Sequence, residues 1–478
     1  MADAAREIAL GILARARTER THASDLMQQA FRATRLGPRQ RRDVAEGVYA
    51  VLRTQRLLDW ALARVAGPGA KALEGTRRDL GRWLASAVLA GAVTPAAARA
   101  ELAGYDWAGL AAAVAAAGEI ADVRERLAVT ESLPDWLAAR LLAELGADGA
   151  AATRLAHALN QRAPMIVRVN RVKTTREALL TRLAAENVEA RATSLAPDGI
   201  ELMTRVNAFG LASFTAGDFE VQDEGSQLVA ELVAPPPRGV VVDACAGAGG
   251  KTLHLGALLG NKGRVVAFDV PPQAERKLEE LRRRARRAGL SNVEALEVPV
   301  NGALPPAAAK LIGRADRVLC DAPCSGLGVL RRNPEARWRL SEADLERLPG
   351  LQGSILDRFA PLVAVGGRLI YATCTITRSE NDDVVAAFLA RSPGFVPMAA
   401  KEILGSARAG HRRRAVAARG PAHARHRRLL RDGAAPHQLI SAWAPARARA
   451  QAKGRSAVAP RATSAARCAA GSRAPGAR

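Results

Sequence analysis

The fold of this 478-residue chain is decided by one stretch, Val240-Val241-Val242-Asp243-Ala244-Cys245-Ala246-Gly247-Ala248-Gly249-Gly250-Lys251-Thr252. An apolar run ends in an acid, a glycine-rich turn follows, and leucines then recur at helical spacing. The pattern predicts a buried strand, a tight turn and a helix, the first unit of a doubly wound parallel sheet that binds a nucleotide-like ligand at its carboxyl edge. The spacing before Lys251 fits neither the dinucleotide fingerprint nor the P-loop, so an ordinary strand-to-helix turn stays open as an alternative.

Three further apolar runs predict strands of the same sheet. The run at residues 264–269 ends in Asp269, an acid that can accept hydrogen bonds from both hydroxyls of a ribose. The run at residues 317–321 leads into Asp-Ala-Pro-Cys324, and the run at residues 367–372 leads into Thr-Cys374. Because parallel strands end at one edge, we expect glycines, acids and two thiols to meet there.

The order of these motifs, DACAGAGGKT, AFDV, DAPCSG and YATCT, resembles the RNA cytosine-5 methyltransferases of the NOL1/NOP2/Sun family. The resemblance covers residues 164 to 397, and the amino-terminal region makes the RsmB type, which methylates 16S ribosomal RNA, the most similar branch. It implies an α/β Rossmann-like class I methyltransferase domain, S-adenosyl-L-methionine as the cofactor, and RNA, 16S ribosomal RNA in particular, as the partner.

The thiols suit the chemistry of cytosine methylation at C5. This carbon becomes nucleophilic only after a thiolate adds to C6, and the reaction then needs a second group that handles a proton. Cys374 and Cys324 with Asp321 beside them offer these groups, and Lys251 could promote ionisation of a thiol whose ordinary pKa is about 8.5. Chemistry alone leaves the attacking thiol open, since DNA cytosine methyltransferases use a Pro-Cys cysteine, which would favour Cys324. The family resemblance implies instead that Cys374 attacks and that Cys324 assists product release.

The resemblance also assigns the cofactor contacts. The turn after the first strand cradles the methionine part, Asp269 holds the ribose, and Asp321 faces the cytosine edge, the cofactor or both. Asn301 stands where the family has an acid that faces adenine, and it carries no charge. The full cofactor set is Cys245, Ala246, Gly247, Ala248, Gly249, Gly250, Lys251, Asp269, Asn301 and Asp321. We expect no metal, because the seven histidines show no ligand spacing with the cysteines.

The chain is expected to be multidomain. Residues 1–145 are predicted to be all-helical and resemble a NusB-like RNA-binding domain with a connector, although a generic bundle with solvated arginines is an alternative. Residues 146–230 resemble a small RRM-like α+β subdomain, and residues 231–398 form the methyltransferase domain. Within the latter, residues 274–288 predict a helix whose arginines face solvent.

The remaining residues, 399–478, form an Arg/Ala-rich tail. From residue 401 on it holds 18 Lys and Arg against two acids, which supplies +16 of the whole-chain +23. One aromatic and little apolar periodicity predict disorder. The tail is either a natural basic RNA-binding segment or the product of a reading-frame shift in a GC-rich gene, and its composition favours the frameshift.

Composition narrows the class of protein. Five cysteines, three of them at strand ends or turns of one sheet, do not indicate a disulfide framework, so we expect a reduced, cytoplasmic compartment. We also expect a monomer. The sequence shows neither an export signal nor an apolar run that would span a membrane. A rival hypothesis is a non-catalytic RNA-binding or antitermination-type factor on an inactive methyltransferase scaffold. The intact Cys324, Cys374, Asp321 and Lys251 favour the enzyme.

Overall fold

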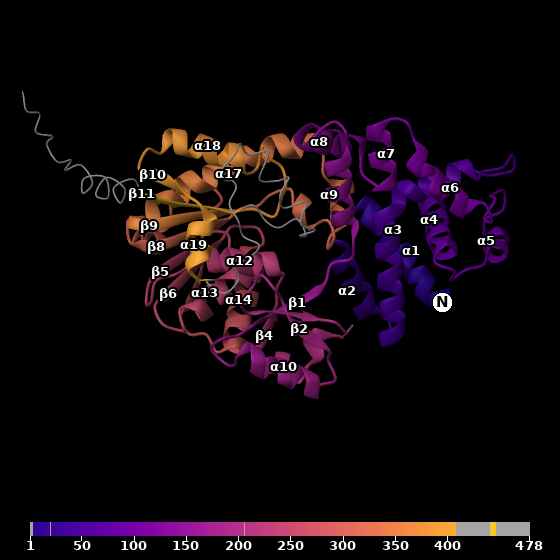
Figure 1. Cartoon of the computed structure of the whole chain (residues 1–478). Helices are drawn as coiled ribbons and strands as arrows, with labels where there is room; N and C mark the ends of the chain where they lie inside the picture. The colour runs from indigo at the N-terminus through magenta and orange to yellow at the C-terminus, as the bar shows by residue number, and fades with distance from the viewer. Residues whose placement is uncertain (1–2, 20, 205, 408–439, 446–478) are drawn as a thin grey trace, which may run out of the picture.

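The computed structural model describes residues 3–19, 21–204, 206–407 and 440–445. A helical amino-terminal part, a small antiparallel sheet and a large, mainly parallel sheet lie side by side (Figure 1). The expected multidomain architecture is therefore confirmed.

The amino-terminal part is all-helical, as expected. Its longest helix begins at the predicted Gly37–Pro38 break, where proline occupies the first turn and the Gln40 side chain accepts the Gly37 backbone N–H at 3.0 Å. Apolar side chains of α1, α2, α3 and α4 form one core, which includes Leu26, Val48 and Leu84. The helices are α1 (Asp3–Thr18), α2 (Ala23–Ala33), α3 (Pro38–Arg64), α4 (Gly75–Leu89), α5 (Pro95–Glu101), α6 (Leu110–Ala116), α7 (Val123–Thr130), α8 (Asp135–Leu145) and α9 (Ala150–Asn160).

The last two of these helices also pack against the domain that contains the large sheet. Leu137 and Leu155 share a buried cluster with Leu327 and Leu330, which follow the Pro-Cys turn at Cys324. The helical part is thus joined through an apolar core to the loop that carries one predicted catalytic thiol.

The small sheet has the expected α+β composition. Its strands are β1 (Met165–Val169), β2 (Ala190–Ala192), β3 (Gly199–Leu202) and β4 (Phe219–Val221), in the order β2-β3-β1-β4 with every pair antiparallel. Helix α10 (Arg176–Ala185) starts at Thr175, whose hydroxyl accepts the Ala178 N–H, and it packs Leu179 on one face of the sheet. The short helix α11 (Ala212–Thr215) precedes β4.

The large sheet has seven strands in the order β10-β11-β9-β8-β5-β6-β7. Strands β5 to β9 pair in parallel, whereas β11 pairs antiparallel with both neighbours. The strands are β5 (Val240–Asp243), β6 (Arg264–Asp269), β7 (Val293–Glu297), β8 (Ala315–Asp321), β9 (Val363–Ala372), β10 (Phe395–Met398) and β11 (Ile440–Pro445). The four strands predicted around the functional motifs are therefore confirmed as neighbours in one sheet.

Helices cover both faces of this sheet. Alternating strand residues divide between two cores, so that Val241 and Leu319 face α12 and α13, whereas Val242 and Val318 face α17 and α18. The helices of this region are α12 (Glu224–Val233), α13 (Gly250–Leu258), α14 (Ala274–Ala288), α15 (Pro306–Ala309), α16 (Ala336–Arg339), α17 (Glu342–Phe359), α18 (Asp382–Arg391) and α19 (Ala400–Ala407).

Two pieces of the predicted tail differ from the expectation of disorder. Residues 400–407 form α19, which buries Ile403 against the sheet, and residues 440–445 form β11 between β9 and β10. Strand β9 offers a row of backbone groups along its edge, and β11 satisfies them despite the arginine-rich context. The rest of the predicted tail, residues 408–439 and 446–478, lies outside the described residues.

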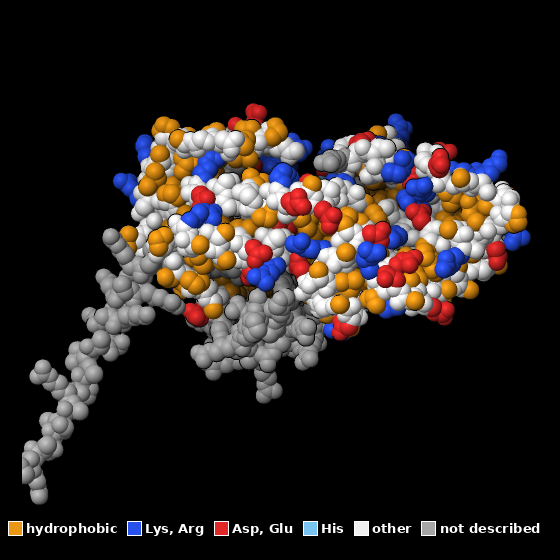
Figure 2. Space-filling model, turned by 90° about the horizontal axis from the view of Figure 1, so that it is seen from above, with side chains coloured by type: hydrophobic (Ala, Val, Ile, Leu, Met, Phe, Trp, Pro, Cys, Tyr) orange, Lys and Arg blue, Asp and Glu red, His pale blue; other side chains and the backbone are white. Residues whose placement is uncertain are grey.

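The described surface shows no segregation of charge on the face drawn in Figure 2, where basic and acidic side chains are interspersed. Among the described helices, none is both long and apolar enough to cross a membrane. The described cysteines, Cys245, Cys320, Cys324 and Cys374, are all free thiols.

Candidate active site

The two predicted catalytic thiols meet at the carboxyl edge of the large sheet. Strands β8 and β9 run in parallel register, with Asp321 opposite Ala372, so the turns that follow them lie side by side. The sulfur atoms of Cys324 and Cys374 are 3.3 Å apart, and the Cys374 backbone N–H points at the Cys324 sulfur at 3.2 Å. This contact joins residues 50 positions apart in the sequence.

The contact gives the two thiols opposite acidities. A hydrogen bond from the Cys324 thiol is the main cause that lowers the pKa of Cys374. The nearby Lys251 ammonium adds to this effect, whereas burial and the Asp321 and Glu380 carboxylates oppose it. The same hydrogen bond, together with burial, raises the pKa of Cys324 well above its ordinary value. Cys374 is therefore the thiol that ionises more readily, and an ionised thiol is the nucleophilic form.

Lys251 and Asp321 form an ion pair beside the thiols. Their Nζ and Oδ2 atoms are 2.6 Å apart, and the lysine side chain is 12% exposed. Burial lowers the pKa of Lys251, but the Asp321 carboxylate, together with Asp243 and Cys374, outweighs it and the net shift is upward. The ammonium therefore stays charged, and it fixes the Asp321 carboxylate at the end of β8.

The glycine-rich turn leaves room for a ligand. Ideal Cβ atoms built on Gly247 and Gly250 would meet no other atom within 4 Å, so the backbone borders open space at both positions. Gly249 is required for another reason, since its φ is +88° and a Cβ there would lie 2.6 Å from Cγ of Leu281 on α14. Gly247 and Gly250 thus leave space for a ligand beside the turn, whereas Gly249 allows α14 to pack against it.

Asp269, the last residue of β6, binds the backbone of this turn. The buried carboxylate accepts the N–H groups of Gly247 and Val270, both at 2.8 Å, and Lys277 reaches it at 3.4 Å. Because each carboxylate oxygen can accept a further hydrogen bond, Asp269 is able to hold a ribose hydroxyl as well. The open glycine turn and this carboxylate fit an adenosine-containing cofactor such as S-adenosylmethionine.

The structure does not unite every predicted cofactor residue. Cys245, Ala246 and Ala248 lie in the turn with the glycines, where burial raises the pKa of Cys245 well above its ordinary value. Asn301, by contrast, is exposed four residues beyond the end of β7. Its predicted contact with adenine stays a prediction.

Several residues that support the turn were not predicted from the sequence. The Arg168 side chain on β1 donates to the carbonyl oxygen of Gly250 at 2.9 Å, and Arg284 on α14 donates to that of Ala248 at 2.6 Å. Arg284 and Arg287 also pair with the buried Glu220 of β4, so the prediction that the α14 arginines are solvated is wrong for these two. The face of α14 that carries Arg284 and Arg287 contacts the small sheet. In the sequence, only the polar residues Glu220 and Arg168 within apolar strands indicated this contact.

A cluster of polar side chains surrounds His254 on α13, the helix that follows the turn. His254, Asp198 and Glu231 present ligand atoms within 4.8 Å of one another, which is close enough for a metal. The Arg171 side chain already contacts Asp198 at 2.6 Å and Glu231 at 3.3 Å, so its charge compensates the two acids. We therefore interpret the cluster as a junction between the small sheet and helices α12 and α13.

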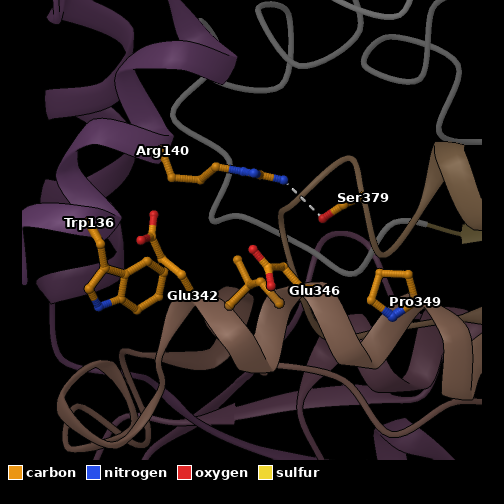
Figure 3. A pocket seen from close by; sticks show the side chains of 7 residues that line it. Trp136, Arg140, Glu342, Glu346, Pro349 and Ser379 are labelled. Carbon is orange, nitrogen blue, oxygen red and sulfur yellow. Dashed lines mark hydrogen bonds between the residues drawn. The ribbon is translucent and has the colours of Figure 1, made fainter.

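A surface cavity lies between α8 and α17, next to the loop that follows β9 (Figure 3). Arg140 of α8 crosses it and donates to Ser379 Oγ at 3.0 Å. Neither thiol lines the cavity, so the cavity is not part of the candidate site.

Comparisons with known proteins support the fold and the class of protein. The sequence profile of a family described as 16S rRNA methyltransferase RsmB/F matches residues 230–414, and a profile for the ferredoxin-like domain of RsmF/B-like methyltransferases matches residues 133–208. Among solved structures, PH0851 has a TM-score of 0.69 at 23% identity, covering 91% of this chain and 97% of that one. A methyltransferase homolog protein from Pyrococcus horikoshii has a TM-score of 0.53 at 22% identity, covering 67% and 97%. These two likenesses support the fold.

Curated relatives carry the family assignment. The chain is 37% identical over 278 residues to a probable ribosomal RNA small subunit methyltransferase B of Bacillus subtilis, an alignment that spans 58% of this chain and 60% of the relative. It is 32% identical over 407 residues to the protein of the same name from Synechocystis sp., and this alignment spans 80% of the chain and 89% of the relative. The chain therefore belongs to the RsmB/F family of 16S rRNA methyltransferases.

Proposed function

We propose that this protein methylates C5 of a cytosine in small-subunit (16S) ribosomal RNA through a covalent bond between Cys374 and C6 of the base. The observation that carries the proposal is the 3.3 Å contact between the Cys374 and Cys324 sulfurs beside the Lys251–Asp321 pair. The relatives named ribosomal RNA small subunit methyltransferases support the substrate class. The monomeric state and the cytoplasmic location stay predictions.

In the proposed reaction, each residue of the site has a separate role. The Cys374 thiolate adds to C6, and the electron pair that it supplies makes C5 nucleophilic. The Asp321 carboxylate, held by Lys251, accepts a hydrogen bond from the cytosine edge, from the cofactor or from both. S-adenosylmethionine, when bound in the glycine turn, supplies the methyl group.

Cys324 acts after the methyl group has been accepted. The C5 proton must then leave, so that the electron pair of the C5–H bond can form the C5–C6 double bond and expel the Cys374 sulfur. The main cause of the raised pKa of Cys324 is its hydrogen bond to Cys374, and this cause is removed once Cys374 is bonded to C6. Once this hydrogen bond is gone, the Cys324 thiol can release its own proton to solvent, and the resulting thiolate accepts the C5 proton as the Cys374 sulfur leaves C6.

Two single substitutions test the assignment. Cys374→Ala should abolish methylation and leave RNA binding within about twofold, whereas Cys324→Ala should accumulate a covalent protein–RNA adduct because elimination stalls. Denaturing gels with ribosomal RNA detect the adduct, and bisulfite sequencing identifies the methylated cytosine. An adduct from Cys374→Ala but not from Cys324→Ala would reverse the two roles.

The cofactor gives an independent control. Calorimetry with S-adenosylmethionine should show binding to the wild type and to both cysteine variants, because neither thiol lies in the glycine turn. If the wild type bound no cofactor, the chain would instead be an RNA-binding factor on an inactive methyltransferase scaffold.

A further inference from the structure

A buried carboxylate lies between the two thiol-bearing turns. Glu380 is fully buried and accepts five hydrogen bonds. Its Oε2 accepts the Ser325 backbone N–H at 2.8 Å and Gln352 Nε2 at 3.0 Å. Its Oε1 accepts the hydroxyls of Ser325, Thr375 and Thr377 at 2.6, 3.1 and 2.9 Å.

These donors lie on the two turns that carry the thiols and on helix α17, so their hydrogen bonds bear on the distance between the two sulfurs. Ser325 follows Cys324 directly, and Thr375 follows Cys374 directly. The Ser325 and Thr375 hydroxyls also contact each other at 2.7 Å. One carboxylate thus holds the residue next to each sulfur, and Gln352, which also donates to the carbonyl oxygen of Pro323 at 3.0 Å, links both to α17.

The position of Glu380 is itself fixed from several sides. Its own carbonyl oxygen accepts the Tyr371 hydroxyl at 2.6 Å, and the neighbouring Asn381 accepts the Thr373 hydroxyl at 2.7 Å. On the solvent side, Arg140 of α8 donates to Ser379, as Figure 3 shows. A buried carboxylate is costly unless its lone pairs are satisfied, and here all five donors are neutral groups. Such an arrangement fixes geometry more than it neutralises charge.

We propose that Glu380 is a positioning residue that holds the sulfurs of Cys324 and Cys374 in contact, so that the Cys324 thiol can donate its hydrogen bond to the Cys374 thiolate. The catalytic meaning of this contact rests on the proposed function, but the contact itself does not. Small displacements of reacting groups lower rates strongly. Glu380→Ala removes all five hydrogen bonds, and the turns at Cys324 and Cys374 should then separate.

The distance between the sulfurs can be measured without methylation. Diamide oxidises two adjacent thiols to a disulfide: the S–S bond forms as both thiols lose a proton, and the diazene is reduced to a hydrazine. The reaction requires the sulfurs to close to about 2.05 Å, so its rate reports their proximity. We expect rapid formation of the Cys324–Cys374 disulfide in the wild type, and formation at least about tenfold slower in Glu380→Ala, measured by mass spectrometry.

Two further variants sharpen the comparison. Glu380→Gln keeps the shape and one acceptor oxygen, so its rate should lie between those of the wild type and Glu380→Ala. Glu224→Ala is the matched control, because Glu224 is a buried carboxylate that accepts two backbone N–H groups, those of Leu195 and Ala196, far in the sequence from either thiol. It should leave the disulfide rate unchanged.

Methylation provides the second readout. In Glu380→Ala, kcat should fall at least about tenfold while KM for S-adenosylmethionine changes less than about twofold, because the residue touches the thiol turns and not the glycine turn. A wild-type disulfide rate in Glu380→Ala would overturn the proposal. If that variant does not fold, Thr375→Val decides in its place, and an unchanged rate there counts equally against it. If the wild type forms the disulfide but never methylates RNA, the proposed function fails and the positioning role stands.

Discussion

At the scale of single residues, the thiol pair predicts a pH dependence. The hydrogen bond from Cys324 is the main cause that lowers the pKa of Cys374, so Cys324→Ala should raise that pKa. Because only the thiolate reacts, the pH at which Cys374 is alkylated at half its maximal rate should move upward in the variant. Iodoacetamide labelling across the pH range, followed by mass spectrometry, measures the shift. Cys245→Ala is the control, and a downward shift in Cys324→Ala would contradict the assigned direction.

The sequence was informative for residues that end a predicted strand. Cys324, Cys374, Asp321 and Asp269 were predicted to share one edge because parallel strands end together, and the structure places them at that edge. Glu380 could not be found this way, since it follows a loop and its importance comes from five donors on three separate segments. Likewise, sequence alone could not decide between the thiols, because their acidities depend on a single contact.

At the scale of elements, strand β1 of the small sheet supports the cofactor turn through Arg168. Arg168→Leu leaves the Gly250 carbonyl and Gln222 Oε1 without this donor, and hydrogen bonds to charged groups contribute about 1.5–3 kcal/mol. We therefore expect calorimetry to show S-adenosylmethionine binding weakened about tenfold or more. Arg191→Leu on β2 removes only an exposed pair with Glu201 and should change nothing. Equal affinities in the two variants would show that β1 does not support the turn.

A helix or strand can be predicted from the sequence only where its own residues carry the pattern that forms it. Helix α14 was predicted with its observed bounds, Ala274–Ala288, and its buried apolar residues recur at helical spacing. Strand β11 has only six residues in an arginine-rich context, and its position depends on the open edge of β9, which is distant in the sequence. The six residues of β11 alone do not reveal that β9 is its partner.

At the scale of the whole molecule, the junction around His254 should make stability depend on pH. Burial, the largest influence, lowers the pKa of His254 to about 3, whereas an unfolded histidine has a pKa of about 6.5. Between these values the unfolded state binds the extra proton, so the free energy of unfolding falls as pH falls, by up to about 1.4 kcal/mol per pH unit. Urea unfolding at about pH 7 and about pH 5 should show a smaller difference for His254→Gln than for the wild type.

The exposed His157 supplies the control for this measurement. Its side chain is 64% exposed, so His157→Gln should retain the pH dependence of the wild type. If His254→Gln and the wild type lost stability equally on acidification, other groups at the junction would account for the effect.

The place of β11 has a consequence for how the protein is made. Among the described residues, only β11 covers the outer edge of strand β9, which leads to Cys374, and β11 is the last described strand of the sheet along the chain. During synthesis the thiols, the ion pair and the glycine turn all leave the ribosome before Ile440 does. Until then the nascent chain presents an unpaired edge, a template for pairing with another chain. A premature stop or a change of reading frame before Ile440 would spare every proposed catalytic residue and still leave a polypeptide prone to self-association.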